Sequence, residues 1–123
     1  MHEIIIADDH EVVSKGLLHL LDSSDIRGTI TLAKSAEQLL NLCREIQPRL
    51  IILDISMPGM GGIEAIRRLR SKWPNQNILV FSIYQNAQLV QKILELGAIG
   101  YVTKSCGGEQ LIEGVTRALA GKP

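Results

Sequence analysis

Five side chains capable of chemistry each stand directly after a short apolar run. Asp8 and Asp9 follow one run, Asp54 follows a second, and Ser82 and Lys104 stand at the ends of two more. In open α/β sheets the carboxyl ends of parallel strands meet at one edge, where functional groups gather. If the runs are such strands, three carboxylates, a hydroxyl and an ammonium group converge there.

The convergence has a definite chemical consequence. Three neighbouring carboxylates repel one another, and burial increases that repulsion. Mg²⁺ prefers hard oxygen ligands and would stabilise such a cluster. A carboxylate beside Mg²⁺ and the Lys104 ammonium group is a competent nucleophile toward phosphorus and forms an aspartyl phosphate. Since Mg²⁺ and Lys104 would neutralise the phosphoryl charge, and Ser82 would donate a hydrogen bond to it, the five residues predict a phosphoryl-transfer site at this edge of the sheet.

Each of these residues also has a plain structural interpretation when it is taken alone. The pair Asp8–Asp9 is more often a solvated strand-to-helix turn, with Asp9 near a helix N-cap. A lone aspartate such as Asp54 after a strand is mostly a cap, and a lone lysine such as Lys104 is usually a solvated surface amine. The functional interpretation is favoured because all of them occur together, after different strands.

The apolar runs indicate the strands that position these residues. Continuous runs at 4–7, 50–53 and 78–81 are typical of central strands covered on both faces. The segment 29–32 alternates between polar and apolar residues and 99–103 is mixed, which predicts two edge strands.

Helical periodicity separates the strands. Apolar residues share one face in five segments, which lie within 13–21, 39–46, 63–69, 89–94 and 111–119. Ser35 and Gln38 predict a capping box at the start of the second helix. Trp73-Pro74 closes the third helix, and Gly97 ends the fourth as a left-handed cap.

This order predicts an α/β fold, a (βα)5 three-layer sandwich of the flavodoxin-like and CheY-like type. Right-handed crossovers give a parallel five-stranded sheet in the order 2-1-3-4-5. The 123 residues and their 46% hydrophobic content suit one domain over 1–123 with an aliphatic core.

Composition and charge argue against several classes of protein. The formal charge is zero, which argues against direct nucleic-acid binding. No apolar run approaches the roughly 18 residues that span a membrane. Cys43 and Cys106 form neither a disulfide framework nor a metal-spaced cluster, and residues 1–20 carry no secretion pattern, so a cytoplasmic location is expected.

Weaker signals receive structural interpretations. The segment 57–62 fails the phosphate-binding glycine patterns and is expected to be a tight loop. His10 is expected in the first turn of a helix rather than as a metal ligand, because imidazole suits Mg²⁺ poorly. Cys43 lies on an apolar helix face and is assigned to the core, whereas Cys106 is a weak candidate for a reactive thiol.

On these residues the chain resembles the receiver domain of bacterial two-component response regulators, the CheY-like family. The resemblance covers essentially the whole chain and rests on Asp8–Asp9, the segment 54–62, Ser82 and Lys104. Residues 8–10, 16–18 and 97–104 are most similar to the NarL/FixJ (LuxR-type) subgroup. There a receiver usually precedes a helix-turn-helix DNA-binding domain, so we expect this chain to be the N-terminal part of a longer regulator of transcription.

The resemblance implies a role for each acidic residue. Asp54 would accept a phosphoryl group from the phosphohistidine of a sensor histidine kinase. Asp9 and Asp54 would be direct Mg²⁺ ligands together with the backbone carbonyl of Ser56, and Asp8 would hold a metal-bound water.

The resemblance also implies a switch. Ser82 and Lys104 would hold the phosphoryl oxygens, and Tyr101 would turn inward as Ser82 moves toward the phosphate. Homodimerisation is expected either through the fourth helix, fifth strand and fifth helix or through the first and fifth helices.

Four residues distinguish the chain from many relatives or tune its chemistry. Ser105 replaces the proline that often follows the lysine after a cis bond, and a non-proline cis bond costs about 3–4 kcal/mol. Ser82 is a less common choice than threonine. Ser56 and Tyr84 occupy positions that influence the lifetime of the acyl phosphate.

Three alternatives remain. A haloacid-dehalogenase-like phosphatase also uses a strand-end aspartate with Mg²⁺, but its second aspartate would stand where Ser56 is. A flavin-binding module would need backbone donors for the flavin phosphate rather than an anionic edge. A receiver used only as an interaction scaffold would not need the complete acidic set.

Overall fold

Five strands alternate with five helices along the chain. The structure, a computed structural model, describes residues 2–26, 28–57, 60–104 and 108–122. The elements are β1 (His2–Ala7), α1 (Glu11–Asp22), β2 (Gly28–Ala33), α2 (Ala36–Ile46), β3 (Leu50–Leu53), α3 (Gly62–Lys72), β4 (Asn77–Ser82), α4 (Ala87–Glu95), β5 (Gly100–Thr103) and α5 (Gly108–Leu119). The predicted order of elements is confirmed.

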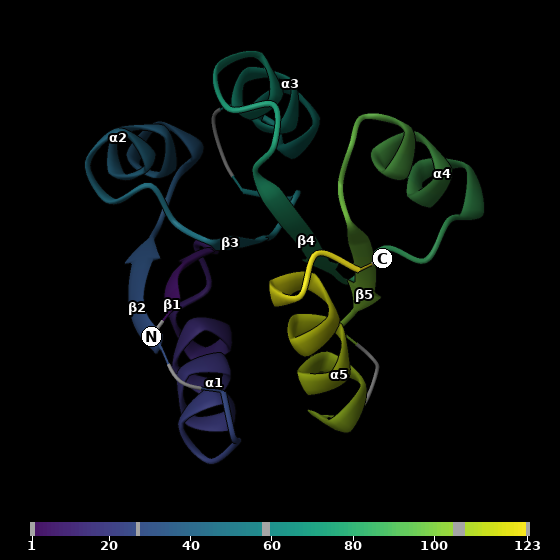
Figure 1. The fold of residues 1–123 in the computed structure, drawn as a ribbon. Helices are drawn as coiled ribbons and strands as arrows, with labels where there is room; N and C mark the ends of the chain where they lie inside the picture. The colour runs from purple at the N-terminus through teal and green to yellow at the C-terminus, as the bar shows by residue number, and fades with distance from the viewer. Residues whose placement is uncertain (1, 27, 58–59, 105–107, 123) are drawn as a thin grey trace.

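The strands form one sheet in the order β2-β1-β3-β4-β5, with every neighbouring pair parallel. Helices α1 and α5 cover one face, and α2, α3 and α4 cover the other (Figure 1). Every residue of β3 is buried, whereas the edge strands β2 and β5 are partly exposed. The α/β sandwich, its strand order and the two edge strands therefore match the expectation.

Successive strand residues point to opposite faces, which divides the core in two. In β1, Ile5 packs in the cluster beneath α2, α3 and α4, whereas Ile4 and Ile6 pack in the cluster beneath α1 and α5. Cys43 lies in the first cluster and is 1% exposed, as expected for a core residue. Burial raises the pKa of its thiol to about 11, because the apolar surroundings disfavour the thiolate.

Two predicted helix ends can be followed atom by atom. The Ser35 hydroxyl accepts a hydrogen bond from the Gln38 N–H at 3.1 Å and caps α2. The Gln38 side chain bonds the N–H of Lys34 rather than that of Ser35, so the predicted box is shifted by one residue. Gly97 has φ +109° after α4, and the N–H groups of Gly97 and Ala98 reach back to Leu94 and Ile93, which closes the helix in a Schellman arrangement.

One glycine is required by a close backbone approach next to the strand-end residues. A Cβ atom at Gly62 would lie 2.3 Å from the Ile55 Cα atom, and the Gly62 N–H donates to the Ile55 carbonyl. The start of α3 therefore rests directly on the loop that follows β3. Met57 in this loop is buried, whereas Pro58 and Gly59 of the expected tight loop lie outside the described residues.

At the opposite end of the sheet, Arg70 links the loops that precede β4 and β5. The sequence did not single out this residue. Its guanidinium group donates to the carbonyls of Pro74, Gln76 and Gly97. A Cβ atom at Gly97 would lie 2.6 Å from the Arg70 Nε atom, so glycine is needed there for space as well as for φ. Among the described helices, none is long and apolar enough to cross a bilayer.

Candidate functional site

The ends of four strands bring the predicted residues together. The Asp54 N–H donates to the Ala7 carbonyl at 2.9 Å, which places the residue after β3 beside the end of β1. The Lys104 N–H donates to the Ser82 carbonyl at 2.7 Å, which joins the ends of β5 and β4. The predicted convergence of the acidic, hydroxyl and ammonium groups at one sheet edge is therefore present.

Lys104 bridges two buried carboxylates. Its Nζ atom lies 3.0 Å from Asp8 Oδ2 and 3.3 Å from Asp54 Oδ2. The side chains of Asp8 and Asp54 are 2% and 1% exposed, and that of Lys104 is 12% exposed. Charges this well buried need a partner, because each ion loses its hydration. One ammonium group stands against these two carboxylates.

The two oxygens of Asp54 have different surroundings. Oδ1 accepts hydrogen bonds from the Ser56 N–H at 3.1 Å and from the Ser56 hydroxyl at 2.9 Å. Oδ2 faces Lys104. The turn after β3 thus fixes the orientation of the carboxylate. The resemblance predicted a role for the Ser56 carbonyl, and the contact of its hydroxyl with Asp54 was not anticipated.

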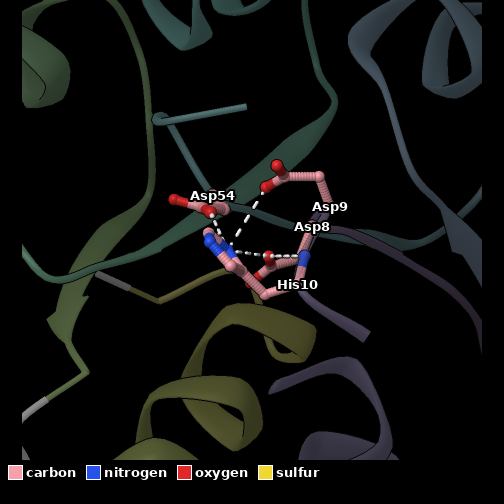
Figure 2. A group of neighbouring side chains, drawn as sticks. All are labelled: Asp8, Asp9, His10 and Asp54. Carbon is pink, nitrogen blue, oxygen red and sulfur yellow. Dashed lines mark hydrogen bonds and ion pairs between the residues drawn. The ribbon is translucent and has the colours of Figure 1, made fainter. Parts of the chain in front are cut away.

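His10 completes the acidic cluster, as Figure 2 shows. Its Nδ1 atom lies 3.1 Å from Asp8 Oδ1, 3.2 Å from Asp9 Oδ1 and 3.7 Å from Asp54 Oδ2. His10 is the N-cap residue of α1, one position before the first-turn placement expected for it, and it makes no side-chain cap bond. Asp9 directly precedes this cap, so its expected position near a helix N-cap is confirmed.

The placement of the His10 ring follows from a local turn. The His10 N–H donates to Asp8 Oδ1 at 2.8 Å, which folds the chain back over the Asp8 carboxylate and directs the imidazole toward the neighbouring acids. The only sequence signal for this was the position of His10 immediately after two aspartates.

Ser82, at the end of β4, and Tyr101, in β5, share one neighbour. Ser82 is fully buried, and its hydroxyl oxygen accepts from the Tyr84 N–H at 3.2 Å. The Tyr101 hydroxyl donates to the Tyr84 carbonyl at 2.7 Å. Tyr101 is half-buried, as expected for an edge-strand tyrosine. The backbone of Tyr84 therefore connects the two residues that the sequence assigned to a switch.

The donor set fits a hard divalent cation. One ligand atom from each of Asp8, Asp9, His10 and Asp54 lies within 4.8 Å of the others. Oxygen ligands of this kind suit Mg²⁺, and the carboxylates outnumber the Lys104 ammonium group. The arrangement can therefore hold a cation next to a nucleophilic carboxylate. Ser105 and Cys106, with the expectations placed on them, lie outside the described residues.

Comparisons with known proteins agree with this geometry. A family model for the response regulator receiver domain matches residues 4–116. The response regulator GacA of Pseudomonas aeruginosa is 32% identical over 99% of this chain and 57% of its own length. The nitrate/nitrite response regulator protein NarL of Escherichia coli is 34% identical over 97% of this chain and 55% of its own length.

A solved structure is similar in fold. The two-component response regulator of the LuxR family from Aurantimonas sp. SI85-9A1 superposes with a TM-score of 0.91 and 33% identity, covering 99% of this chain and 87% of that one. The chain spans a little more than half the length of the two curated relatives. The phosphatase alternative gains no support from these matches.

Proposed function

The chain belongs to the response regulator receiver domain family, and from that premise we propose that Asp54 accepts a phosphoryl group from a sensor histidine kinase in a Mg²⁺-dependent reaction. The domain is a signalling switch of a two-component system rather than a classic enzyme. The single observation that carries the proposal is the buried Asp54 carboxylate, held by Lys104 at 3.3 Å and by Ser56 at 2.9 Å.

The reaction is a transfer between two nucleophiles. An oxygen of Asp54 forms a bond to phosphorus as the bond from phosphorus to the kinase imidazole nitrogen breaks, and that nitrogen keeps the electron pair. The orientation of Asp54 is set in advance by the Ser56 bonds, which lowers the entropic part of the barrier. Lys104 already lies against Asp54 and neutralises charge on the transferred group.

The metal ligands would come from the same cluster. Asp9, Asp54 and the Ser56 carbonyl would hold Mg²⁺ directly, and Asp8 would hold it through a water. When bound, the ion supplies positive charge to the carboxylates and to the phosphoryl oxygens. Asp8 also holds Lys104 at 3.0 Å and so keeps its ammonium group directed at Asp54.

The switch would run from Ser82 to Tyr101. A phosphoryl group on Asp54 offers the Ser82 hydroxyl a charged acceptor, and its move toward that acceptor breaks the bond with the Tyr84 N–H. Tyr101, held by the Tyr84 carbonyl, would then turn inward. Hydrogen bonds to charged groups contribute about 1.5–3 kcal/mol each, so a few of them approach the roughly 5.5 kcal/mol that inverts a 1:99 equilibrium.

The output that the domain controls is inferred from the lengths and names of its relatives. The relatives are about twice as long as the matched segment, and two of them are named as a transcriptional activator protein, ExaE of Pseudomonas putida, and a transcriptional regulatory protein, YdfI of Bacillus subtilis. We infer that this domain controls a helix-turn-helix domain that follows it in a longer protein. DNA would then be contacted through that domain, in the cytoplasm, with a homodimer as the active form.

Phosphorylation of the isolated domain tests the proposal. Incubation with acetyl phosphate or phosphoramidate and Mg²⁺ should add one phosphoryl group, measured by intact mass. The adduct should be absent from Asp54→Asn and when EDTA replaces Mg²⁺. If the wild-type chain takes up no phosphoryl group under these conditions, or instead hydrolyses unrelated phosphoesters rapidly, the proposal is wrong.

A further inference from the structure

The imidazole of His10 faces the same point as the three carboxylates. Its Nδ1 atom approaches one oxygen from each of them, at 3.1, 3.2 and 3.7 Å. Figure 2 shows the ring directed into the acidic cluster rather than away from it. A nitrogen in this position is chemically different from a fourth oxygen.

The distance from His10 Nδ1 to Asp9 matches that between neighbouring ligands of one ion. Two ligand atoms bonded at about 2.1 Å and at right angles lie about 3.0 Å apart. The separation from Nδ1 to Oδ1 of Asp9, a direct ligand in the proposed function, is close to that value. The longer separation to Asp54 Oδ2 falls between those of adjacent and opposite ligands in an octahedron.

We propose that His10 Nδ1 is an additional ligand of this metal site and that the site therefore favours divalent transition ions that bind imidazole, such as Co²⁺ and Ni²⁺. The inference rests on the metal site of the proposed function and adds to it a nitrogen donor. Carboxylates and water suit Mg²⁺, whereas imidazole suits the later transition ions. Mg²⁺ would use the oxygens alone. His10 would therefore raise the affinity for the transition ions and leave that for Mg²⁺ unchanged.

Local structure permits the ring to act in this way. The position of His10 is fixed by its N–H bond to Asp8 Oδ1, so the imidazole is held near the acids without a bond from its own side chain to the helix end. For coordination through Nδ1 the ring carries its proton on Nε2. Removal of the imidazole therefore takes away a donor atom and leaves the helix cap as it is.

Calorimetric titration of the tag-free chain with Mg²⁺ and with Co²⁺, at one pH in a non-coordinating buffer, tests the proposal. His10→Ala should weaken Co²⁺ binding by more than about tenfold, the lower end of what loss of a supporting group at a metal site costs, and should change the Mg²⁺ affinity by less than about threefold. Pulsed electron paramagnetic resonance of bound Cu²⁺, an ion that imidazole suits, should show coupling to a ligand nitrogen that His10→Ala removes.

The other two of the chain's three histidines supply matched controls. His2→Ala and His19→Ala should leave both affinities and the nitrogen coupling unchanged. Unchanged Co²⁺ binding in His10→Ala, or equal losses for Co²⁺ and Mg²⁺, would overturn the nitrogen ligand while leaving the proposed function intact. A wild-type chain that binds Co²⁺ through His10 but never binds Mg²⁺ would instead count against the proposed function.

Discussion

The hydroxyl groups of Ser82 and Tyr101 engage the two sides of one peptide backbone, that of Tyr84. Ser82 accepts from the Tyr84 N–H at 3.2 Å, and Tyr101 donates to the Tyr84 carbonyl at 2.7 Å. A change at the buried serine can therefore reach the edge strand through one residue. No side-chain atom of Tyr84 takes part in either bond.

Ser82→Ala should separate phosphorylation from the switch. Asp54 keeps its Lys104 and Ser56 contacts, so the adduct should still form. The Tyr101 ring signals in NMR spectra should no longer shift when the phosphoryl mimic beryllofluoride is added. Loss of the buried acceptor should also destabilise the chain by about 1–3 kcal/mol, measured by urea unfolding.

Tyr84→Phe is the control for that experiment. It removes the exposed hydroxyl of residue 84 and keeps both backbone bonds, so the Tyr101 shift should persist. A full Tyr101 response in Ser82→Ala would show that the change travels by another route.

Lys104→Met should make stability depend on Mg²⁺. The substitution leaves the Asp8 and Asp54 carboxylates without their ammonium partner. We expect a loss of about 3 kcal/mol in EDTA, the low end for a broken buried pair because the exposed Asp9 and His10 keep the cluster near solvent. Mg²⁺ binds the folded state alone and should recover part of that loss.

Urea unfolding with and without Mg²⁺ measures the effect. Lys15→Met is the matched control, since Lys15 forms only an exposed pair with Glu11. Its unfolding free energy should change by less than about 0.5 kcal/mol in either buffer. Equal changes of unfolding free energy in Lys104→Met and Lys15→Met would contradict a stabilising role for the contacts of Lys104 with Asp8 and Asp54.

Gly62→Ala should disturb the loop that carries Asp54 and Ser56. The new Cβ atom would meet the Ile55 backbone at 2.3 Å, so α3 or the loop must move. We expect destabilisation of more than about 2 kcal/mol, as for other overpacked sites, together with slower phosphorylation by acetyl phosphate.

The neighbouring Gly61→Ala tests whether space is the cause. Gly61 has φ −65°, and a Cβ atom there meets nothing within 4 Å. Its cost should stay below about 1 kcal/mol, arising only from the weak capping tendency of alanine. Similar losses at both positions would contradict the steric explanation.

Cys43 should contribute a pH dependence in the alkaline range. Burial raises the pKa of its thiol from 9.0 to about 11, so the unfolded chain releases this proton at lower pH than the folded chain. The stabilising contribution is complete below pH 9 and is lost as the pH rises to about 11. Since one pKa unit corresponds to about 1.4 kcal/mol, the loss of unfolding free energy approaches about 3 kcal/mol.

The difference between wild type and Cys43→Ala isolates this contribution. Lysines and tyrosines titrate in both proteins, whereas the thiol is present in one. Unfolding free energies measured from pH 8 to pH 11 should therefore converge between the two proteins as the pH rises. A constant difference across that range would mean that the thiol is not desolvated in the folded chain.

The sheet and the convergence of its strand ends could be predicted because they follow from local patterns. Three continuous apolar runs and two mixed ones fix central and edge strands, and parallel topology then places Asp54 and Lys104 at the same edge. No knowledge of side-chain conformation is needed for that step.

The finer contacts could not be predicted because they depend on particular turns. The direction of the His10 ring follows from an N–H bond to Asp8, and the Ser56 hydroxyl reaches Asp54 through a two-residue turn. Arg70 binds three carbonyls contributed by two different loops, the one before β4 and the one before β5. Neither residue spacing nor hydrophobic period carries information about such contacts.

Asp8 and Lys104 lie 96 residues apart in the chain and 3.0 Å apart in space. The ends of β1 and β5 must both be in place before this contact exists, so a chain that lacks β5 lacks the ammonium group beside Asp8 and Asp54. If Asp54 is the phosphoryl acceptor proposed above, phosphorylation would require that the sheet has formed from β1 to β5. In a cell, incomplete copies of the domain would then not be phosphorylated and would not compete with intact copies for phosphoryl groups.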